Sequence, residues 1–362
     1  MTDNGRMTLR FLAAPTDVAS MGGAVRGGRL LNWIDKAAYA CAAAWSGGYC
    51  VTAYVGNVRF SRHVRAGDLV EVTARIVYTG TSSMHLMCTV SAADPCTGEY
   101  REVSDCLVVF IALDEHRRPR AVPPWRPRTL QEIADAEAAI ARIGLRKRIE
   151  AEMASTTYSD AGIAPEAKMR FLAAPTDVNW GGNAHGGRIM EWMDEAAYTC
   201  ATQWASQDCV SAYVGGVRFY APVHIGDVVR TRSRLLHTGR QTMHIAVRMS
   251  AGDPRTGEFR DTSHALVIVA AIDADGDAIG KPVSKDEMNS EQVEASVNRE
   301  YHAEYGELNL KVNNHVQKWI NYFQGRGRSY METYLQRSSR YLPMMKATLR
   351  EQGLPEDLVY IA

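Results

Sequence analysis

Two aspartates, Asp35 and Asp194, stand in the middle of apolar segments that each follow a glycine-rich turn. The second turn, Gly181-Gly-Asn-Ala-His-Gly-Gly187, leads into the stretch 188–204, where apolar residues recur at the three- and four-residue spacing of one helix face. The other faces are also largely apolar, so we expect an enclosed helix, in which a carboxylate is costly unless it is paired or used. Glycines let the backbone approach a ligand closely, and a helix start offers unpaired N–H groups. The pattern predicts a buried acid beside an anion-stabilising helix start.

This segment occurs twice because the chain contains an internal repeat. The run Arg10-Phe-Leu-Ala-Ala-Pro-Thr-Asp-Val18 recurs unchanged at 170–178, an offset of 160. After a one-residue insertion in the first copy, the offset is 159 and holds as far as Asp114 and Asp273. Two copies of about 115 residues indicate a duplicated domain, whose halves usually meet about a pseudo-twofold axis.

The order of predicted elements gives the fold class. A polar lead-in and the glycine turn precede the helix, and four strand-like runs follow it, at 50–60, 69–79, 84–92 and 100–113 in the first copy. One helix with four or five antiparallel strands predicts an α+β unit whose sheet curls round the helix. Between the copies, a proline-rich stretch precedes a predicted exposed helix over 129–152, where Thr129 and Glu132 have the spacing of a capping box.

We therefore divide the chain into four parts. They are a first domain at 1–125, a linker with a helix at 126–165, a second domain at 166–283, and a C-terminal linker with a small all-α segment at 284–362.

Composition excludes several classes of function. The formal net charge is zero and no basic run with interleaved aromatics occurs, which argues against nucleic-acid binding. No stretch has the length of a membrane span, and the first ten residues lack the apolar core of a signal peptide. The seven cysteines have no CxxC spacing, so we expect reduced thiols and a cytoplasmic protein. No cluster has metal-ligand spacing, so we expect no metal.

The second copy resembles the tandem, or double, hotdog-fold acyl-CoA thioesterases (acyl-coenzyme A hydrolases), and the resemblance spans 7–283. It is carried by Pro175-Thr-Asp-Val-Asn179, His185-Gly-Gly187, Trp192-Met-Asp194, Phe219-Tyr-Ala-Pro-Val223 and Gly226-Asp227. The resemblance implies two hotdog domains paired as a pseudo-dimer, each with a central helix wrapped by antiparallel sheet. It also implies acyl-CoA as the substrate, no cofactor because coenzyme A is part of that substrate, and a homo-oligomer, with a trimer of double hotdogs as the family expectation.

In that family an asparagine of one domain and an acid of the other domain's helix act on the thioester. Carried over by position, one site combines Asn179, as a catalytic residue, with Asp35, while the backbone of Gly186 and Gly187 holds the carbonyl oxygen. The other site combines Ser20 with Asp194 and lacks the asparagine, and Arg26 replaces His185 there. The resemblance therefore implies one complete site between the domains. Asp35 would act as general base or as nucleophile, two mechanisms that the residues leave open.

Three further residues are weaker candidates for substrate binding. His185 is expected to position the substrate or to pack, because its equivalent is an arginine. Thr81 and Ser82 resemble the family's loop near the pantetheine arm. His85 and His244 hold matching strand positions and are interpreted as structural.

The segment 293–362 resembles a different family, the region that precedes the catalytic core of membrane-bound lytic murein transglycosylases. The runs at 316–328 and 353–362 carry that likeness. The catalytic glutamate of that family would follow these residues, so no acid is carried over and we expect no peptidoglycan cleavage. A gene fusion, a truncated reading frame or an engineered join would each explain this lytic-transglycosylase-like fragment.

We predict an acyl-CoA thioesterase that yields free fatty acid and coenzyme A. One alternative is a non-catalytic acyl-CoA-binding protein of the same fold. A second makes the C-terminal segment a cell-wall-associated module. The preferred acyl-chain length is left open.

Overall fold

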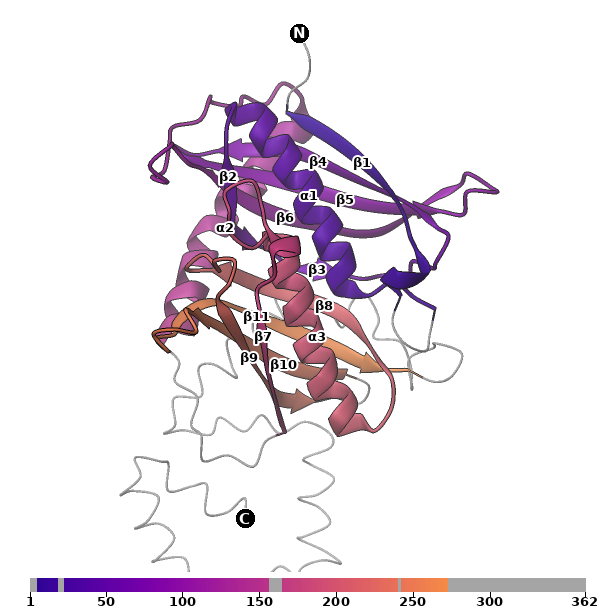
Figure 1. The fold of residues 1–362 in the computed structure, drawn as a ribbon. Helices are drawn as coiled ribbons and strands as arrows, with labels where there is room; N and C mark the ends of the chain where they lie inside the picture. Colours follow the sequence, from indigo (N-terminus) through magenta and orange to yellow (C-terminus); the bar gives the residue numbers. More distant parts are fainter. Residues whose placement is uncertain (1–4, 19–22, 156–164, 240–241, 273–362) are drawn as a thin grey trace, which may run out of the picture. The chain divides into compact units, whose positions relative to one another are not determined.

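The structure, a computed structural model, describes residues 5–18, 23–155, 165–239 and 242–272. Ser20 and the C-terminal segment with its transglycosylase-like runs lie outside these residues. Each of the two repeats forms one domain with a long helix and an antiparallel sheet (Figure 1).

The long helices are α1, Gly27–Ser46, and α3, Gly186–Ala205. Each begins directly at a glycine pair and ends where the next residue turns left-handed, Gly47 at φ 67° and Ser206 at φ 54°. Glycine adopts this conformation without steric cost, which makes it a common helix end. As the apolar pattern predicted, most side chains in the first three turns of both helices are buried.

The strands of both domains join into one antiparallel sheet. The first domain contributes β1 (Arg6–Leu12), β2 (Cys50–Val55), β3 (Val58–Arg59), β4 (Leu69–Thr79), β5 (Ser83–Ala93) and β6 (Tyr100–Ala112). The second contributes β7 (Glu166–Leu172), β8 (Cys209–Phe219), β9 (Val228–Thr238), β10 (Thr242–Gly252) and β11 (Arg260–Ala271). The order is β1-β4-β5-β6-β2-β8-β11-β10-β9-β7, and β2 pairs with β8 at the domain boundary, where Tyr54 lies opposite Arg218. The predicted fold class, two paired hotdog domains, is confirmed.

Two local predictions were wrong. The polar lead-in is strand β1, and its equivalent is β7, because alternate residues pack inward: Phe11 stacks on Trp33 and Phe171 packs on Trp192. The run at 50–60 is not one strand, since the Gly56 N–H donates to Leu107 O and the chain re-forms as β3 against β8. The same run in the second domain stays continuous as β8.

Helices lie on both faces of the sheet. Figure 1 shows α1 and α3 side by side on one face, where they pack against each other and the core. The linker helix α2, Leu130–Ser155, lies on the other face, where Ala139 packs against Val77 and Leu107. Ala136 and Ala139 are its buried residues, and most of its other described side chains are exposed, as predicted. Its capping box is confirmed, since the Glu132 N–H donates to Thr129 Oγ1 (3.2 Å) and the Thr129 N–H to Glu132 Oε2 (3.0 Å).

Within the described part of the chain, no helix is both long and apolar enough to cross a membrane.

Candidate active site

The carboxylate of Asp35 is buried at the contact between the two domains. Its residue is 1% exposed and lies in α1 of the first domain. Thr52 Oγ1, from β2 of the same domain, donates to Oδ1 over 2.7 Å. The N–H of Gly187, at the start of α3 in the second domain, donates to Oδ2 over 2.8 Å. Hydrogen bonds from both domains therefore offset part of the cost of burying this polar group.

His185 completes the surroundings of Asp35. Its Nδ1 lies 3.0 Å from Asp35 Oδ2 and 3.1 Å from the Gly187 nitrogen. Burial lowers the pKa of His185, but the hydrogen bond to Asp35 and the charge of that carboxylate together raise it above its ordinary value. A protonated Nδ1 donates to Asp35, and the Gly187 N–H then donates to the same oxygen. His185 therefore contacts Asp35 from the second domain, and its role in positioning the substrate stays a prediction.

Glycine is required at both positions where α3 begins. A Cβ on Gly186 would lie 2.7 Å from Thr52 Oγ1 and 3.1 Å from Asp35 Oδ2. A Cβ on Gly187 would lie 2.8 Å from the backbone of Asn32 in α1. The two glycines differ in their surroundings, because Gly186 lines the cavity at the site whereas the Gly187 N–H already donates to Asp35. The geometry therefore does not support Gly187 as a donor to a substrate carbonyl and leaves that role to Gly186.

Asn179 lies in the loop that leads into α3, and its side chain organises that loop. Its Oδ1 accepts hydrogen bonds from the N–H groups of Gly181 (2.8 Å) and Asn183 (3.1 Å). The Asn179 N–H donates to Asn183 O over 2.6 Å. Because two N–H groups donate to it, this atom of the amide must be the oxygen, and the NH₂ group lies on the other side. The NH₂ group makes one long contact, to Ala184 O at 3.5 Å. The donor end of this amide is therefore the part suited to meet a substrate.

A cavity of about 260 Å³ brings these groups together. Asp35, Thr52, Asn179, His185 and Gly186 all line it. Its apolar wall includes Tyr39, Phe110, Leu113 and Ile189. Thr81 and Ser82 do not belong to its lining and lie in the turn between β4 and β5. There the backbone carbonyl of Thr81 accepts from the Val122 N–H and that of Ser82 from the Ala112 N–H, so the turn holds the chain that leaves β6.

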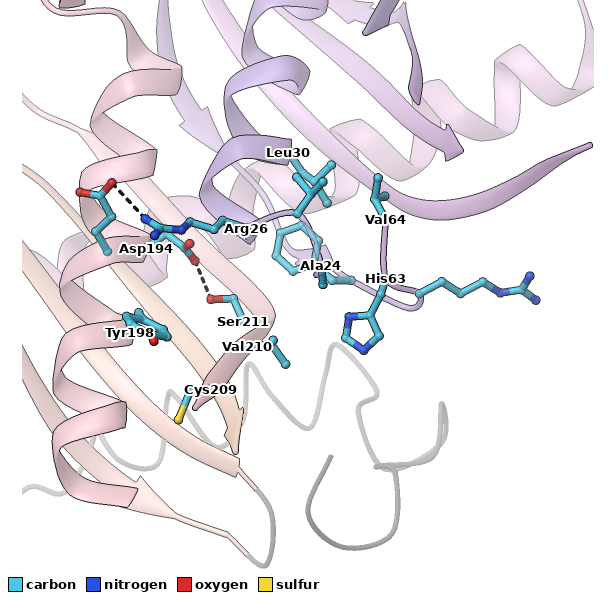
Figure 2. A pocket seen from close by; sticks show the side chains of 15 residues that line it. Ala24, Arg26, Leu30, His63, Val64, Asp194, Tyr198, Cys209, Val210 and Ser211 are labelled. Carbon is cyan, nitrogen blue, oxygen red and sulfur yellow. Dashed lines mark hydrogen bonds and ion pairs between the residues drawn. The ribbon is translucent and has the colours of Figure 1, made fainter. Parts of the chain in front are cut away.

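The pseudo-symmetric position around Asp194 keeps equivalent hydrogen bonds but has an arginine in place of His185 (Figure 2). Ser211 Oγ donates to Asp194 Oδ1 over 2.5 Å, and the backbone of Gly28 also bonds to this carboxylate. Arg26, in place of His185, reaches across the boundary and pairs with Glu195 at 3.7 Å. The enclosed space there is about 40 Å³. Burial raises the pKa of Asp194, against the bonds from Ser211 and Gly28 and the charge of Arg26.

Ion pairs tie the two helix starts together beside these cavities. Arg29 bonds Asp17 (2.7 Å) and Glu191 (3.2 Å), and Arg188 bonds Asp177 (2.9 Å) and the same Glu191 (2.7 Å). Glu191 therefore links one arginine from each domain and helps to fix the distance between α1 and α3.

Sequence reasoning missed Thr52. A signal was present, because the 159-residue offset pairs Thr52 with Ser211, so both copies keep a hydroxyl two residues after the matching cysteines Cys50 and Cys209. Tyr49 and Arg117, which both lie beside the Asn179 loop, were also missed, and the second copy offers no equivalent, with Asp208 and Gly276 at those positions.

The remaining candidates lie apart from the cavities. His85 packs edge-on against Tyr78, and His244 against His237; burial and the charge of His237 lower the pKa of His244 to about 4. In the described ranges, no group of three or more His, Cys, Asp or Glu side chains could hold a metal ion.

Comparisons with known proteins agree with this architecture. A family model described as the thioesterase superfamily matches residues 22–98 and 181–258. The acetyl-coenzyme A thioesterase of Rattus norvegicus is 24% identical over 292 residues, which cover 75% of this chain and 52% of that protein. Protein VdlD of Helicobacter pylori is 31% identical over 146 residues, 40% of this chain and 83% of that protein.

A solved structure described as an oleoyl thioesterase from Lactobacillus plantarum has a TM-score of 0.52 at 10% identity, covers 74% of this chain and 97% of that one, and is similar in fold alone. The chain spans about half the length of the rat relative that it matches. The two matched segments lie at equivalent places in the two repeats, and each includes the glycine turn and the long helix. The chain belongs to the thioesterase superfamily.

Proposed function

We propose that this protein hydrolyses acyl-CoA thioesters to a free acid and coenzyme A in the cavity beside Asp35. The observation that carries the proposal is the convergence of a buried carboxylate, its Thr52 and Gly187 donors and the amide of Asn179 on one cavity of about 260 Å³. The relatives named as acetyl-coenzyme A thioesterase and cytosolic acyl coenzyme A thioester hydrolase support this class of substrate.

In the proposed reaction, the thioester carbonyl carbon lies beside Asp35. The carboxylate takes a proton from a water molecule whose oxygen attacks that carbon, or it attacks directly to form an anhydride that water then opens. The Gly186 N–H stabilises the carbonyl oxygen as it gains negative charge, an interaction typically worth about 10²–10³ in rate. In the first route the C–S bond then breaks, and the leaving thiolate takes the proton that Asp35 removed from water. In the second route the C–S bond breaks as the anhydride forms, and the thiolate takes a proton from solvent.

The other residues hold the reacting groups in place. Thr52 and Gly187 keep the carboxylate oriented through their hydrogen bonds. The NH₂ group of Asn179 positions the water or the thioester, because its oxygen is occupied by the loop. His185 balances the charge of Asp35 from the second domain.

We further propose that each chain has one working site. The space around Asp194 is about 40 Å³, against about 260 Å³ around Asp35, and the Arg26–Glu195 pair lies where the first site has His185. The smaller space and the ion pair leave less room for a substrate beside Asp194 than beside Asp35. Ser20, the predicted partner of Asp194, lies outside the described residues.

Thiol release from acyl-CoA esters of graded chain length tests the proposal. Purified protein should release thiol at a rate that depends on chain length and is unchanged after dialysis against EDTA, since the proposed reaction uses no metal. Binding of the esters without thiol release at any length would refute hydrolysis and favour an acyl-CoA-binding protein. The four-part domain division, the cytoplasmic location and the homo-oligomer remain predictions.

A further inference from the structure

The loop that carries Asn179 is held from the opposite domain by two side chains. Arg117 lies after β6 of the first domain, and its Nη2 donates to the backbone oxygen of Gly181 over 2.5 Å. Tyr49 lies before β2 of the same domain, and its ring packs on Gly181 so closely that an added Cβ would lie 2.2 Å from the hydroxyl oxygen. Both contacts fall two residues after Asn179.

The Tyr49 hydroxyl is also close to the Asn179 side chain. Burial raises the pKa of Tyr49, while the side chain of Asn179, the charge of Arg117 and the side chain of Asn183 lower it, in that order. The geometry places the phenol oxygen, which is buried, against Gly181 of this loop. The Asn179 oxygen bonds to the N–H groups of Gly181 and Asn183, so a displacement of Gly181 is passed directly to the Asn179 amide.

Arg117 has a backbone conformation that glycine would adopt at lower cost, which indicates that its side chain is the reason for an arginine at this position. Its φ is 61°, in the left-handed region that favours glycine, and the equivalent position of the second repeat is Gly276. The turn itself is made by Asp114, whose Oδ1 accepts from the N–H groups of His116 and Arg118, and it needs no arginine at its left-handed residue. Strained residues of this kind cluster at functional sites.

We infer that Tyr49 and Arg117 are positioning residues of the first domain that hold Asn179 of the second over the Asp35 cavity. This inference rests on the proposed function for its kinetic readout alone. The second repeat has Asp208 and Gly276 at the equivalent positions, so this interdomain clamp belongs to the larger cavity.

Arg117→Gly gives the most discriminating test. Glycine relieves the left-handed strain, so the melting temperature should stay equal or rise, while the loss of the bond to Gly181 should lower kcat about tenfold. A merely structural arginine would give the opposite pattern, a lower melting temperature with kcat unchanged. Tyr49→Leu, which removes the ring that packs on Gly181, should lower kcat at constant KM. Arg118→Gly, the exposed neighbour, is the matched control and should leave kcat unchanged.

Hydrogen exchange of the peptide that covers 179–184 tests the clamp without any turnover. Arg117→Gly and Tyr49→Leu should both speed exchange in this peptide at least threefold and leave the α3 peptide unchanged. Unaltered exchange in both variants would overturn the inference, whether or not the protein hydrolyses thioesters. Faster exchange with full kcat would also overturn it, because the loop would then be held without consequence for Asn179. Absence of thiol release from the unsubstituted protein would count against the proposed function, and exchange would still decide the clamp.

Discussion

Gly186→Ala tests whether thiol release depends on the geometry of the site independently of the stability of the fold. The new methyl would lie 2.7 Å from Thr52 Oγ1 and 3.1 Å from Asp35 Oδ2, and the first of these distances is shorter than real Cβ contacts. Thr52 is β-branched and stiff at χ1, so its hydroxyl moves away only by changing rotamer, which breaks its 2.7 Å bond to Asp35. The helix start or the carboxylate must otherwise shift by about 0.5 Å, toward the displacement of about 1 Å that costs roughly 10² in rate.

Gly27→Ala is the matched control, because Gly27 begins α1 as Gly186 begins α3. Its methyl would meet Ser211 Cβ at 3.0 Å, Phe60 at 3.1 Å and Asp194 Oδ1 at 3.2 Å. Overpacking of this kind destabilises a core by about 1–3 kcal/mol, so urea unfolding should give similar losses for both variants. Thiol release should fall about 10²-fold for Gly186→Ala and less than about threefold for Gly27→Ala. Equal loss of turnover in the two variants would refute the proposal that only one cavity works.

Three further substitutions test single contacts. Asn179→Asp keeps the oxygen that accepts from the two loop N–H groups and removes the NH₂ donor. Thiol release should therefore fall about 10²-fold while the melting temperature is unchanged. A similar loss of melting temperature in Asn179→Asp and Asn179→Ala would contradict this division of roles. Asp35 raises the pKa of His185, so their ion pair stabilises the fold fully below the unfolded-state pKa of about 6.5 and is lost as pH rises through the higher folded-state value. The cost of His185→Gln in urea unfolding should therefore be larger at pH 6 than at pH 9, and a constant cost would count against the pair. Glu191→Gln should cost about 1–2 kcal/mol, since the two arginines that it links are about one-third exposed and partly screened, and urea unfolding at low and high salt measures this.

Periodicity predicted the regular elements because buried positions recur at the period of a helix or strand and are occupied by apolar residues. The helices around Asp35 and Asp194 are enclosed, so their apolar residues repeat on more than one face. The strand β1 was missed although Met7, Leu9 and Phe11 alternate with polar residues, since this edge strand buries one face only and reads as a polar segment by composition.

No residue pattern within either repeat predicts how the two domains pair. The bond from Gly187 to Asp35 depends on how the start of α3 meets the interior of α1, 152 positions away in the sequence. The resemblance to known thioesterases, rather than spacing, predicted a site between the domains. Thr52 could have been found by comparing the repeats. Tyr49 and Arg117 could not, because each acts on a loop of the other domain and has no counterpart in the second copy.

The central claim is that turnover depends on Asp35 and not on its symmetry mate Asp194. Thiol release by the purified protein, by Asp35→Asn and by Asp194→Asn, each with the best acyl-CoA ester, tests it most directly, with melting temperatures to confirm folding. We predict a loss of at least about 10³-fold for Asp35→Asn and a change of less than about twofold for Asp194→Asn. Comparable losses in both variants, or full activity in Asp35→Asn, would contradict the assignment of the working site.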